Sequence, residues 1–370
     1  MMSRPFSQAN FMYVIAQPEA KPLLVSALER VHPGLRLAYS RPGLYSFKAP
    51  EPELPLDFRA QVPFARHDGF ALGAVKDRST LTQWLAPLRS ALRLHVFARD
   101  AGEGKPRATP EAVERCRRAL LDSHPSCFNP EGTPAIGDWV LDVILPPDVP
   151  SRSPSLAADV AATDADAATE PWFVGYHRHD ASRSPLPGSV ARRAMPETAP
   201  SRAWSKLEEA TDWANLPLRA GDVAVEIGCA PGGAVMALVD RGLEVVGIDP
   251  AAMDPRLMAH CTQIQASFRH IAQPVAAVTR EFLPKRVDWL LSDANLAPQV
   301  VLRTLSHWCK WLRPQLRGVV FTMKLNDRRV ADALPQLIAR VGEFGLGEPR
   351  AVQLPSHRQE VVVIATRKRR

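Results

Sequence analysis

The sequence lacks the features of disulfide-stabilised, secreted and membrane-spanning proteins. Its five cysteines form no C-x-x-C pair, their number is odd, and a chain of 370 residues needs no disulfide staples to stabilise a core. No uninterrupted apolar run approaches the roughly 18 residues of a membrane span. Residues 1–12 contain no basic segment followed by an apolar one. We therefore expect reduced thiols, no membrane segment and a cytoplasmic location.

The excess of basic residues is modest. Lysine and arginine outnumber aspartate and glutamate by 46 to 39, which gives a formal net charge of +7 and a pI near 9.4. Such a charge favours an anionic partner such as RNA or DNA, but it also suits proteins that bind no nucleic acid. With 46% hydrophobic residues the chain can bury at least one full core, and its length favours two domains over one.

The first half of the chain alternates strand-like and helix-like patterns. Short apolar runs predict strands and amphipathic segments predict helices. Strands are predicted at residues 11–16, 35–40, 44–49, 92–99 and 139–145, and helices at residues 19–31, 80–88 and 110–122. This pattern indicates an α+β amino-terminal region.

A change of composition interrupts this region. Residues 146–171 are poor in large apolar side chains and rich in Ala, Asp, Ser and Pro, so we expect a disordered insertion at about 147–170. The break is either a domain linker or a long hairpin loop, if the segment WFVGYHRH after it pairs with WVLDVIL before it. We favour the hairpin, which moves the boundary to the Pro- and Arg-rich residues 184–200. The regions are then residues 1–190 and 200–370.

The second half alternates helices with nearly continuous apolar strands such as DVAVEIG, EVVGID, DWLLSD, GVVFTMK and EVVVIATR. Strands of this kind are buried on both faces, which predicts an α/β, Rossmann-like, doubly wound and mostly parallel sheet. Ligands of such sheets bind beyond the carboxyl ends of the strands.

The first strand–helix connection of this half has the composition of a nucleoside-binding turn. Glycines let backbone approach a ligand, and Pro231 suits a helix start near that position. Asp249, at the end of the next strand, can accept hydrogen bonds from ribose hydroxyls. The turn reads G-C-A-P-G-G and not G-x-G-x-x-G, which disfavours a pyrophosphate and favours S-adenosyl-L-methionine. Alternatively the glycines serve packing alone. The candidate loop residues are Gly228, Cys229, Ala230, Pro231, Gly232 and Gly233.

Four charged residues are placed to meet at the same edge of the sheet. Asp293 and Lys324 end apolar strands, Glu360 begins the last strand, and Lys206 lies in the helix before the first strand. If the last strand is antiparallel to its neighbours, all four side chains converge beside the cofactor's methyl group. A surface ion-pair network with little effect on chemistry is the alternative.

The strings SRAWSKLEEA, EIGCAPGG, SDAN, TMKLND and SHRQEVVVIATR resemble the K-D-K-E tetrad and glycine loop of FtsJ-like ribose 2'-O-methyltransferases. More narrowly, they resemble the RlmM-like family of large-subunit ribosomal RNA methyltransferases. The segments at residues 172–188 and 197–210 resemble the junction of that family's RNA-binding THUMP domain with its catalytic domain. The resemblance implies a THUMP-like, ferredoxin-like first region and S-adenosyl-L-methionine as cofactor. It also implies methylation of a cytidine ribose in 23S rRNA, with the tetrad at Lys206, Asp293, Lys324 and Glu360.

Two positions depart from the family pattern. Ala234 stands where an aromatic residue is usual, and Ser267 stands where the family has a cofactor-binding acid near the third strand. We take Ser267, with Asp249 and Asp293, as a cofactor contact. These departures motivate an alternative function, a noncatalytic RNA-binding or ribosome-assembly protein that keeps the fold.

Removal of the ribose hydroxyl proton requires a base within hydrogen-bond reach. We expect this base to be Lys324, with its pKa lowered by burial and by the nearby ammonium of Lys206. Asp293 would orient the lysines, and Glu360 would hold the pair.

The first region, the Arg-rich residues 184–196 and the tail 366–370 would contact RNA phosphates. We expect a monomer that binds RNA, no membrane and no metal. A small-molecule methyltransferase should lack both the lysine pair and the basic first region.

Overall fold

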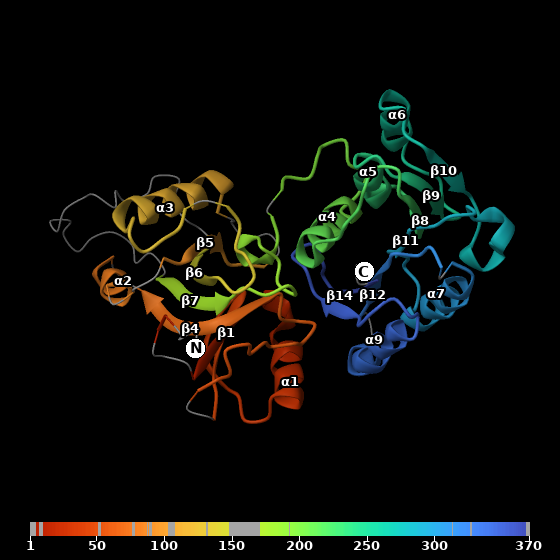
Figure 1. Ribbon diagram of the computed structural model, residues 1–370. Helices are drawn as coiled ribbons and strands as arrows, with labels where there is room; N and C mark the ends of the chain where they lie inside the picture. The colour runs from red at the N-terminus through yellow and green to blue at the C-terminus, as the bar shows by residue number, and fades with distance from the viewer. Residues whose placement is uncertain are drawn as a thin grey trace. The chain divides into compact units, whose positions relative to one another are not determined.

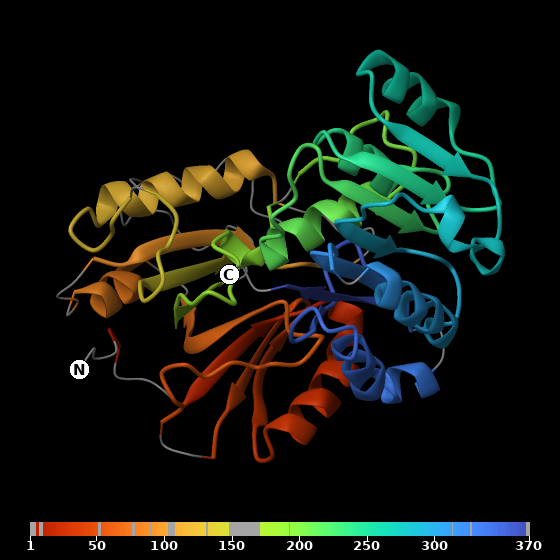
Figure 2. The same cartoon turned by 45° about the vertical axis from the view of Figure 1, so that its right-hand side comes forward.

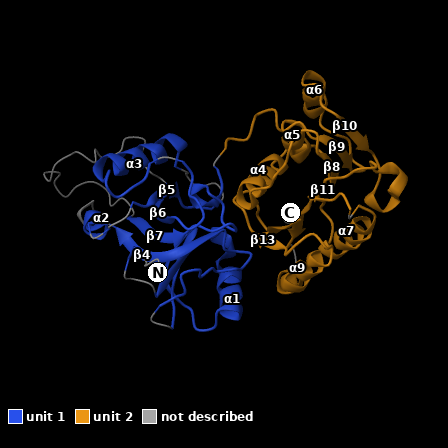
Figure 3. Cartoon of the chain, viewed as in Figure 1, with its two compact units in different colours: residues 1–192 blue, residues 193–370 orange. Residues whose placement is uncertain are grey.

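A computed structural model shows two compact units, Met1–Arg192 and Arg193–Arg370 (Figure 3). The predicted insertion at about 147–170 lies outside the described residues, apart from residue 147. Among the described helices, none has the length and apolar character needed to cross a membrane. The structure describes residues 5–6, 10–50, 53–75, 78–86, 88, 91–102, 108–130, 132–147, 171–191, 193–312, 314–325 and 328–367.

The first unit contains a seven-stranded mixed sheet in the order β2-β3-β1-β4-β7-β6-β5 (Figure 1). Only β5 and β6 pair in parallel among these neighbours. The strands are β1 Phe11–Ile15, β2 Arg36–Arg41, β3 Leu44–Lys48, β4 His67–Val75, β5 Arg93–Ala98, β6 Trp139–Leu145 and β7 Trp172–Arg178. The helices are α1 Lys21–Val31, α2 Arg78–Leu85 and α3 Pro110–Ser123, with the short 3₁₀ helices η1 Pro18–Ala20 and η2 Pro187–Ser189.

The strands that flank the insertion pair with each other. β6 and β7 run antiparallel, with Trp139 opposite Arg178 and Ile144 opposite Phe173. The predicted pairing of WVLDVIL with WFVGYHRH is therefore confirmed. β4, which lies between β1 and β7, was not predicted from the sequence.

The second unit contains another seven-stranded sheet, in the order β10-β9-β8-β11-β12-β14-β13 (Figure 2). Its first five strands are parallel, while β14 runs antiparallel to β12 and β13. The strands are β8 Val223–Ile227, β9 Glu244–Ile248, β10 Phe268–Ile271, β11 Trp289–Ser292, β12 Gly318–Lys324, β13 Arg350–Val352 and β14 Glu360–Thr366. The mostly parallel, doubly wound sheet is as predicted, and the central strands β8 and β11 are buried along their whole length.

The helices of this unit differ from the prediction in two places. The amphipathic segment RRVADALPQLIARVGEFG, whose pattern predicts one helix over residues 328–345, is divided into α8 Arg328–Asp332 and α9 Leu334–Gly342. Pro335, in the first turn of α9, has no N–H to continue α8. A helix not predicted, α6, begins at Pro255 after Asp254, whose side chain accepts a hydrogen bond from Arg256 N. The other helices are α4 Ala203–Ala214, α5 Gly233–Val239 and α7 Pro298–Leu312, with η3 Val275–Ala277 and η4 Arg280–Phe282.

Candidate active site

The four predicted charged residues meet at the carboxyl edge of the second sheet. Lys206 extends from α4 and contacts Asp293, which follows β11, at 3.0 Å and Glu360 at 2.5 Å. Lys324, the last residue of β12, contacts Asp293 at 2.9 Å and Glu360 at 2.6 Å. Because β14 is antiparallel to β12, its first residue, Glu360, is paired with Lys324 in the sheet register. We call these four residues the tetrad.

A contact outside the tetrad fixes the loop before β14 against the helix that carries Lys206. Glu209, also on α4, accepts hydrogen bonds from the backbone N–H and the hydroxyl of Ser356, both at 2.8 Å. The helix and the start of β14 are thereby held together, which sets the distance between Lys206 and Glu360.

The tetrad is shielded from water, so its charges interact more strongly than exposed ion pairs do. Its side chains are only 12–16% exposed. Burial raises the pKa of Glu360, but hydrogen bonds from Lys206 and Lys324 outweigh burial and hold its pKa below the ordinary value. Glu360 is therefore ionised at neutral pH.

The pKa of Lys324 corrects one expectation. Burial lowers the pKa of its ammonium, as predicted, but the contacts with Asp293 and Glu360 raise the pKa by more. The net pKa lies above the ordinary lysine value, and Lys324 is protonated at neutral pH. The expectation of a lowered pKa was wrong because the two carboxylates that hold the lysines outweigh the effect of burial.

The glycines of the loop after β8 allow close contacts between chain segments. Gly228 has φ +79°, and a Cβ there would lie 2.4 Å from Ala294 Cα, beside Asp293. A Cβ on Gly233 would lie 2.5 Å from Ser201 Oγ, at the start of α4. α5 begins only at Gly233, with Gly232 at φ +117° before it, so Pro231 lies outside the helix that we expected it to start. Both glycines therefore allow chain segments to pack closely at this edge of the sheet.

Asp249 lies directly after β9 and contacts the same loop. Its carboxylate accepts hydrogen bonds from Ala230 N at 3.2 Å and from Ala251 N at 2.8 Å. A carboxylate has lone pairs for further partners, so these contacts leave room for a ligand hydroxyl. Cys229 and Pro231 belong to the loop that Asp249 fixes, but the cysteine is buried and burial raises the pKa of its thiol well above the ordinary value, so it is not a reactive thiolate.

Ser267 does not lie in this site. It precedes β10, and Phe268 is level with Val245 near the beginning of β9, so Ser267 is at the amino edge of the parallel sheet. The carboxyl end of β10 is Ile271, whose carbonyl accepts from Asp249 N at 3.2 Å. Assigning Ser267 to the cofactor was therefore wrong, because β10 begins after it and not before it. Gln273 is the first polar residue beyond the strand on the correct side.

Glu226 is a site residue that the sequence analysis missed. It lies within the apolar strand β8, is 2% exposed, and its Oε2 has no hydrogen-bond partner among the described residues. Burial, followed by the nearby charges of Asp293 and Asp249, raises its pKa well above the ordinary value. A buried acid inside an apolar strand was the signal that would have revealed it.

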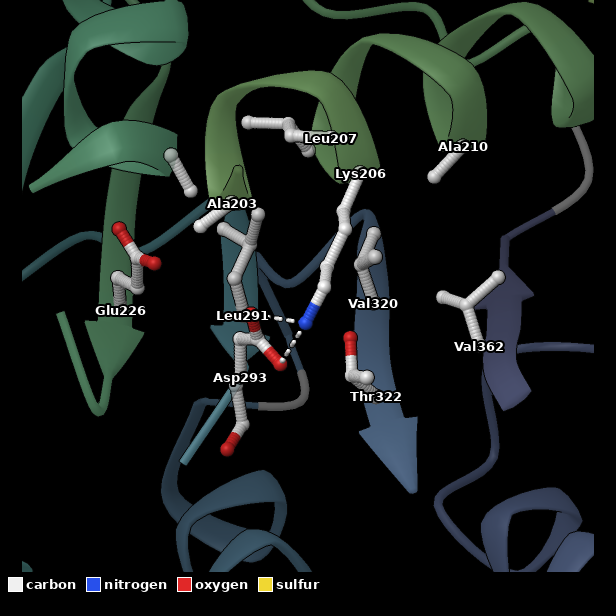
Figure 4. A pocket seen from close by; sticks show the side chains of 12 residues that line it. Ala203, Lys206, Leu207, Ala210, Glu226, Leu291, Asp293, Val320, Thr322 and Val362 are labelled. Atoms are coloured by element: carbon white, nitrogen blue, oxygen red, sulfur yellow. Dashed lines mark hydrogen bonds and ion pairs between the residues drawn. The ribbon is translucent and has the colours of Figure 1, made fainter. Parts of the chain in front are cut away.

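Glu226 lines a pocket beneath α4 together with tetrad residues Lys206 and Asp293 (Figure 4). In Figure 4, Lys206 extends down from the helix towards Asp293, and Glu226 lies on the neighbouring strand. Ala234, where the family has an aromatic residue, also lines this pocket. With Asp249, three carboxyl groups gather at the ends of adjacent strands, an arrangement that suits a ligand carrying positive charge.

The mostly parallel sheet, with acidic groups and a glycine-containing loop at its carboxyl edge, indicates a methyltransferase fold. The comparisons with known proteins agree. Residues 199–330 match the family model described as FtsJ-like methyltransferase. The carboxy-terminal unit is therefore similar to FtsJ-like methyltransferases over these residues, and the resemblance inferred from the sequence is confirmed for this part of the chain.

The similar curated proteins share one description, ribosomal RNA large subunit methyltransferase M. The protein of Alkalilimnicola ehrlichii is 33% identical over 194 residues, which cover 50% of this chain and 51% of that protein. The protein of Halorhodospira halophila is 34% identical over 194 residues, 50% of this chain and 52% of that protein. The protein of Sodalis glossinidius is 33% identical over 207 residues, 53% and 54% of the two chains. The chain thus spans about half the length of the curated relatives it matches.

Proposed function

We propose that this chain is an S-adenosyl-L-methionine-dependent methyltransferase that methylates a ribose 2'-hydroxyl of large-subunit ribosomal RNA, with a cytidine of 23S rRNA as the target. The observation that carries the proposal is the tetrad, in which two ammonium groups and two carboxylates converge beside the loop after β8. The FtsJ-like family match and the description shared by the relatives support the reaction and the substrate class.

The residues around the pocket suit the cofactor. S-adenosyl-L-methionine carries a sulfonium and an ammonium, and the ends of β8, β9 and β11 offer the carboxyl groups of Glu226, Asp249 and Asp293. Asp249 would hold the ribose hydroxyls, the unpaired Glu226 Oε2 would accept from the ammonium, and the Gln273 amide would face the adenine. When bound, the cofactor supplies an electrophilic methyl group.

The tetrad would hold the ribose hydroxyl and remove its proton. Lys324 is the proposed base, and it must first lose the proton that it carries in the ligand-free protein. Asp293 and Glu360 would fix the position of its Nζ. Lys206 contacts the same two carboxylates, so their negative charge stabilises two ammonium groups and not that of Lys324 alone. The tetrad would then hold the ribose hydroxyl in line with the cofactor's methyl group and accept the hydroxyl proton.

RNA would be held by the first unit and by basic residues outside the tetrad. Within the Arg-rich residues 184–196, Arg193 contacts Asp212 of α4 at 2.5 Å, so this arginine is tied to the catalytic unit. We propose that the protein acts in the cytoplasm, where its proposed ribosomal RNA substrate is found, and that it acts as a monomer.

The proposal is tested first by calorimetry with S-adenosyl-L-methionine and then by methyl transfer to 23S rRNA transcripts. Micromolar binding, and a single ribose methylation that disappears from the rRNA of a strain lacking the protein, are the expected results. Millimolar or absent binding would favour the noncatalytic RNA-binding alternative. Methylation of free nucleosides in place of RNA would favour a small-molecule enzyme.

A further inference from the structure

Four side chains with metal-ligand atoms converge in the core of the first unit. His67, His177, Asp142 and His95 come from β4, β7, β6 and β5, which are consecutive neighbours in the sheet. His95 is directly opposite Asp142 in the register. Asp142 is opposite Gly175, and His177, two residues further along β7, lies on the same face. We call this set the histidine cluster.

The spacing of its ligand atoms suits a single tetrahedral ion. Metal–ligand bonds of about 2.0–2.1 Å place neighbouring ligand atoms about 3.3 Å apart around such an ion. His67 Nε2 lies 3.2 Å from Asp142 Oδ1, and His95 Nδ1 lies 3.6 Å from the same oxygen. His177 Nδ1 and Asp142 Oδ2 share a hydrogen bond of 2.6 Å, which is shorter than this spacing, so an ion would replace that hydrogen bond and separate the two atoms. Ligand atoms of His67, Asp142 and His177 all lie within 4.8 Å of one another and form the centre of the cluster. His95 lies outside that group of three and approaches it through Asp142, so it is the candidate for the fourth ligand.

Two hydroxyl groups orient the cluster from outside. Tyr13 donates a hydrogen bond to Asp142 Oδ2 at 2.7 Å, and Ser189 Oγ lies 2.8 Å from His67 Nδ1, which directs the opposite nitrogen of that ring to Asp142. Gly69 and Gly175 make room for the Tyr13 ring, because a Cβ on either residue would lie under 3 Å from it. Partners of this kind fix the orientation of ligands in metal sites.

Two imidazole nitrogens of the cluster, His95 Nδ1 and His177 Nε2, lack a hydrogen-bond partner among the described residues, and His95 Nδ1 is the one that faces Asp142. His95 is 3% exposed, and its Nδ1, directed at Asp142, has no hydrogen-bond partner among the residues that the structure describes. A buried nitrogen without a hydrogen-bond partner reduces the free energy of unfolding by about 1–3 kcal/mol. An ion between His95 and Asp142 would remove that cost.

We propose that His67, His95, Asp142 and His177 form a structural site for one zinc-type divalent cation in the first unit. Three imidazoles and a carboxylate without thiolate suit zinc, and a site closed inside a core, with no position open to substrate, is structural. The inference is independent of the proposed methyltransferase function and departs from the expectation of no metal. The ligands come from four different strands, so no short sequence motif contains them.

The test uses the full chain purified without a polyhistidine tag, incubated with zinc chloride and desalted. Elemental analysis should find one zinc ion per chain. Cobalt in place of zinc should give the absorption of a tetrahedral nitrogen–oxygen site without a thiolate charge-transfer band. Failure to retain zinc would overturn the proposal, and so would a thiolate band, because it would assign the ion to a cysteine.

Variants locate the ion. His95→Gln and His177→Gln should lose the zinc, whereas the control His307→Gln, on the exposed face of α7, should keep it. Tyr13→Phe keeps the ring and removes only the hydroxyl that orients Asp142, so zinc affinity should fall by about 10–100-fold. Full zinc content in the histidine variants would refute the assignment. If those variants do not fold, unchanged zinc affinity in Tyr13→Phe would refute the assignment.

Discussion

Lys206 and Lys324 contact the same two carboxylates, although they lie on a helix and a strand that are 118 positions apart in the chain. Each ammonium bridges Asp293 and Glu360 at distances of 2.5–3.0 Å. Positive and negative groups therefore alternate around a closed ring. Removal of any member leaves its neighbours with uncompensated charge in a site that is largely shielded from water.

Replacing Lys324 by alanine should reduce kcat for methyl transfer by about 10²–10⁴-fold, because the proposed base is lost. Binding of S-adenosyl-L-methionine should stay near normal, since the loop after β8 and Asp249 are not altered. Single-turnover methyl transfer and calorimetry measure the two effects. Lys310→Ala, an exposed lysine on α7, is the matched control and should leave both unchanged. Normal turnover in Lys324→Ala would refute its role.

The rate of methyl transfer should rise with pH. Asp293 and Glu360 hold the pKa of Lys324 above its ordinary value, so only a small fraction is neutral at pH 7. If neutral Lys324 is the base, the single-turnover rate should increase by about tenfold per pH unit between about pH 7 and about pH 9. A rate independent of pH would show that Lys324 acts as an ammonium, which stabilises the developing oxyanion in place of taking the proton.

Glu360→Gln tests the contribution of the tetrad to stability. The folded pKa of Glu360 is lower than the unfolded one, so its ionised form stabilises the fold above the unfolded pKa, and this contribution is lost as pH falls through the folded pKa. The variant should lower the free energy of unfolding by about 1–3 kcal/mol at pH 7, with a difference that shrinks under acid conditions. Denaturant titrations across pH measure it. A constant difference would mean that the effect is not electrostatic.

The sequence predicted those parts of the fold whose patterns are local. Apolar strands bounded by charged residues located β8, β9, β11, β12 and β14 together with Asp293, Lys324 and Glu360, whereas Lys206 was assigned to the helix before β8. β4 was missed although it is central, because Gly69 and Gly73 interrupt its apolar pattern and it begins with the polar residues His67 and Asp68. Its glycines are explained only by long-range contacts, such as the Tyr13 ring against Gly69.

The errors in the site have the same origin. Ser267 was misassigned because the start of a four-residue strand cannot be fixed to within a residue or two from pattern alone. The net pKa of Lys324 depends on how many carboxylates reach it, which no spacing in the sequence reveals. Glu226 and the histidine cluster are buried polar groups within apolar strands, and sequence alone gives no indication of their partners.

Glu226→Gln should stabilise the ligand-free protein. The folded pKa of this acid is raised, so ionisation opposes folding once pH exceeds the unfolded pKa, and the penalty grows until pH reaches the folded pKa. A neutral amide of the same shape removes that penalty, and the melting temperature should rise most at alkaline pH. Affinity for S-adenosyl-L-methionine should fall, because the amide cannot neutralise the ligand's ammonium. A melting temperature that does not change with pH relative to the wild type would contradict the buried-acid interpretation.

Alanine substitutions at two glycines distinguish the effect of backbone strain from the effect of a close contact in the site. Gly221 and Gly228 both have φ +79°, so alanine at either position costs about 1–2 kcal/mol of strain. A Cβ on Gly221 meets nothing within 4 Å, whereas one on Gly228 lies 2.4 Å from Ala294 Cα and would displace the chain that carries Asp293. Gly221→Ala should therefore lower stability without changing cofactor binding or turnover. Gly228→Ala should lower stability further and should also weaken cofactor binding and turnover. Chemical denaturation and calorimetry compare the two, and equal effects on cofactor binding would show that the contact with Ala294 does not position the site.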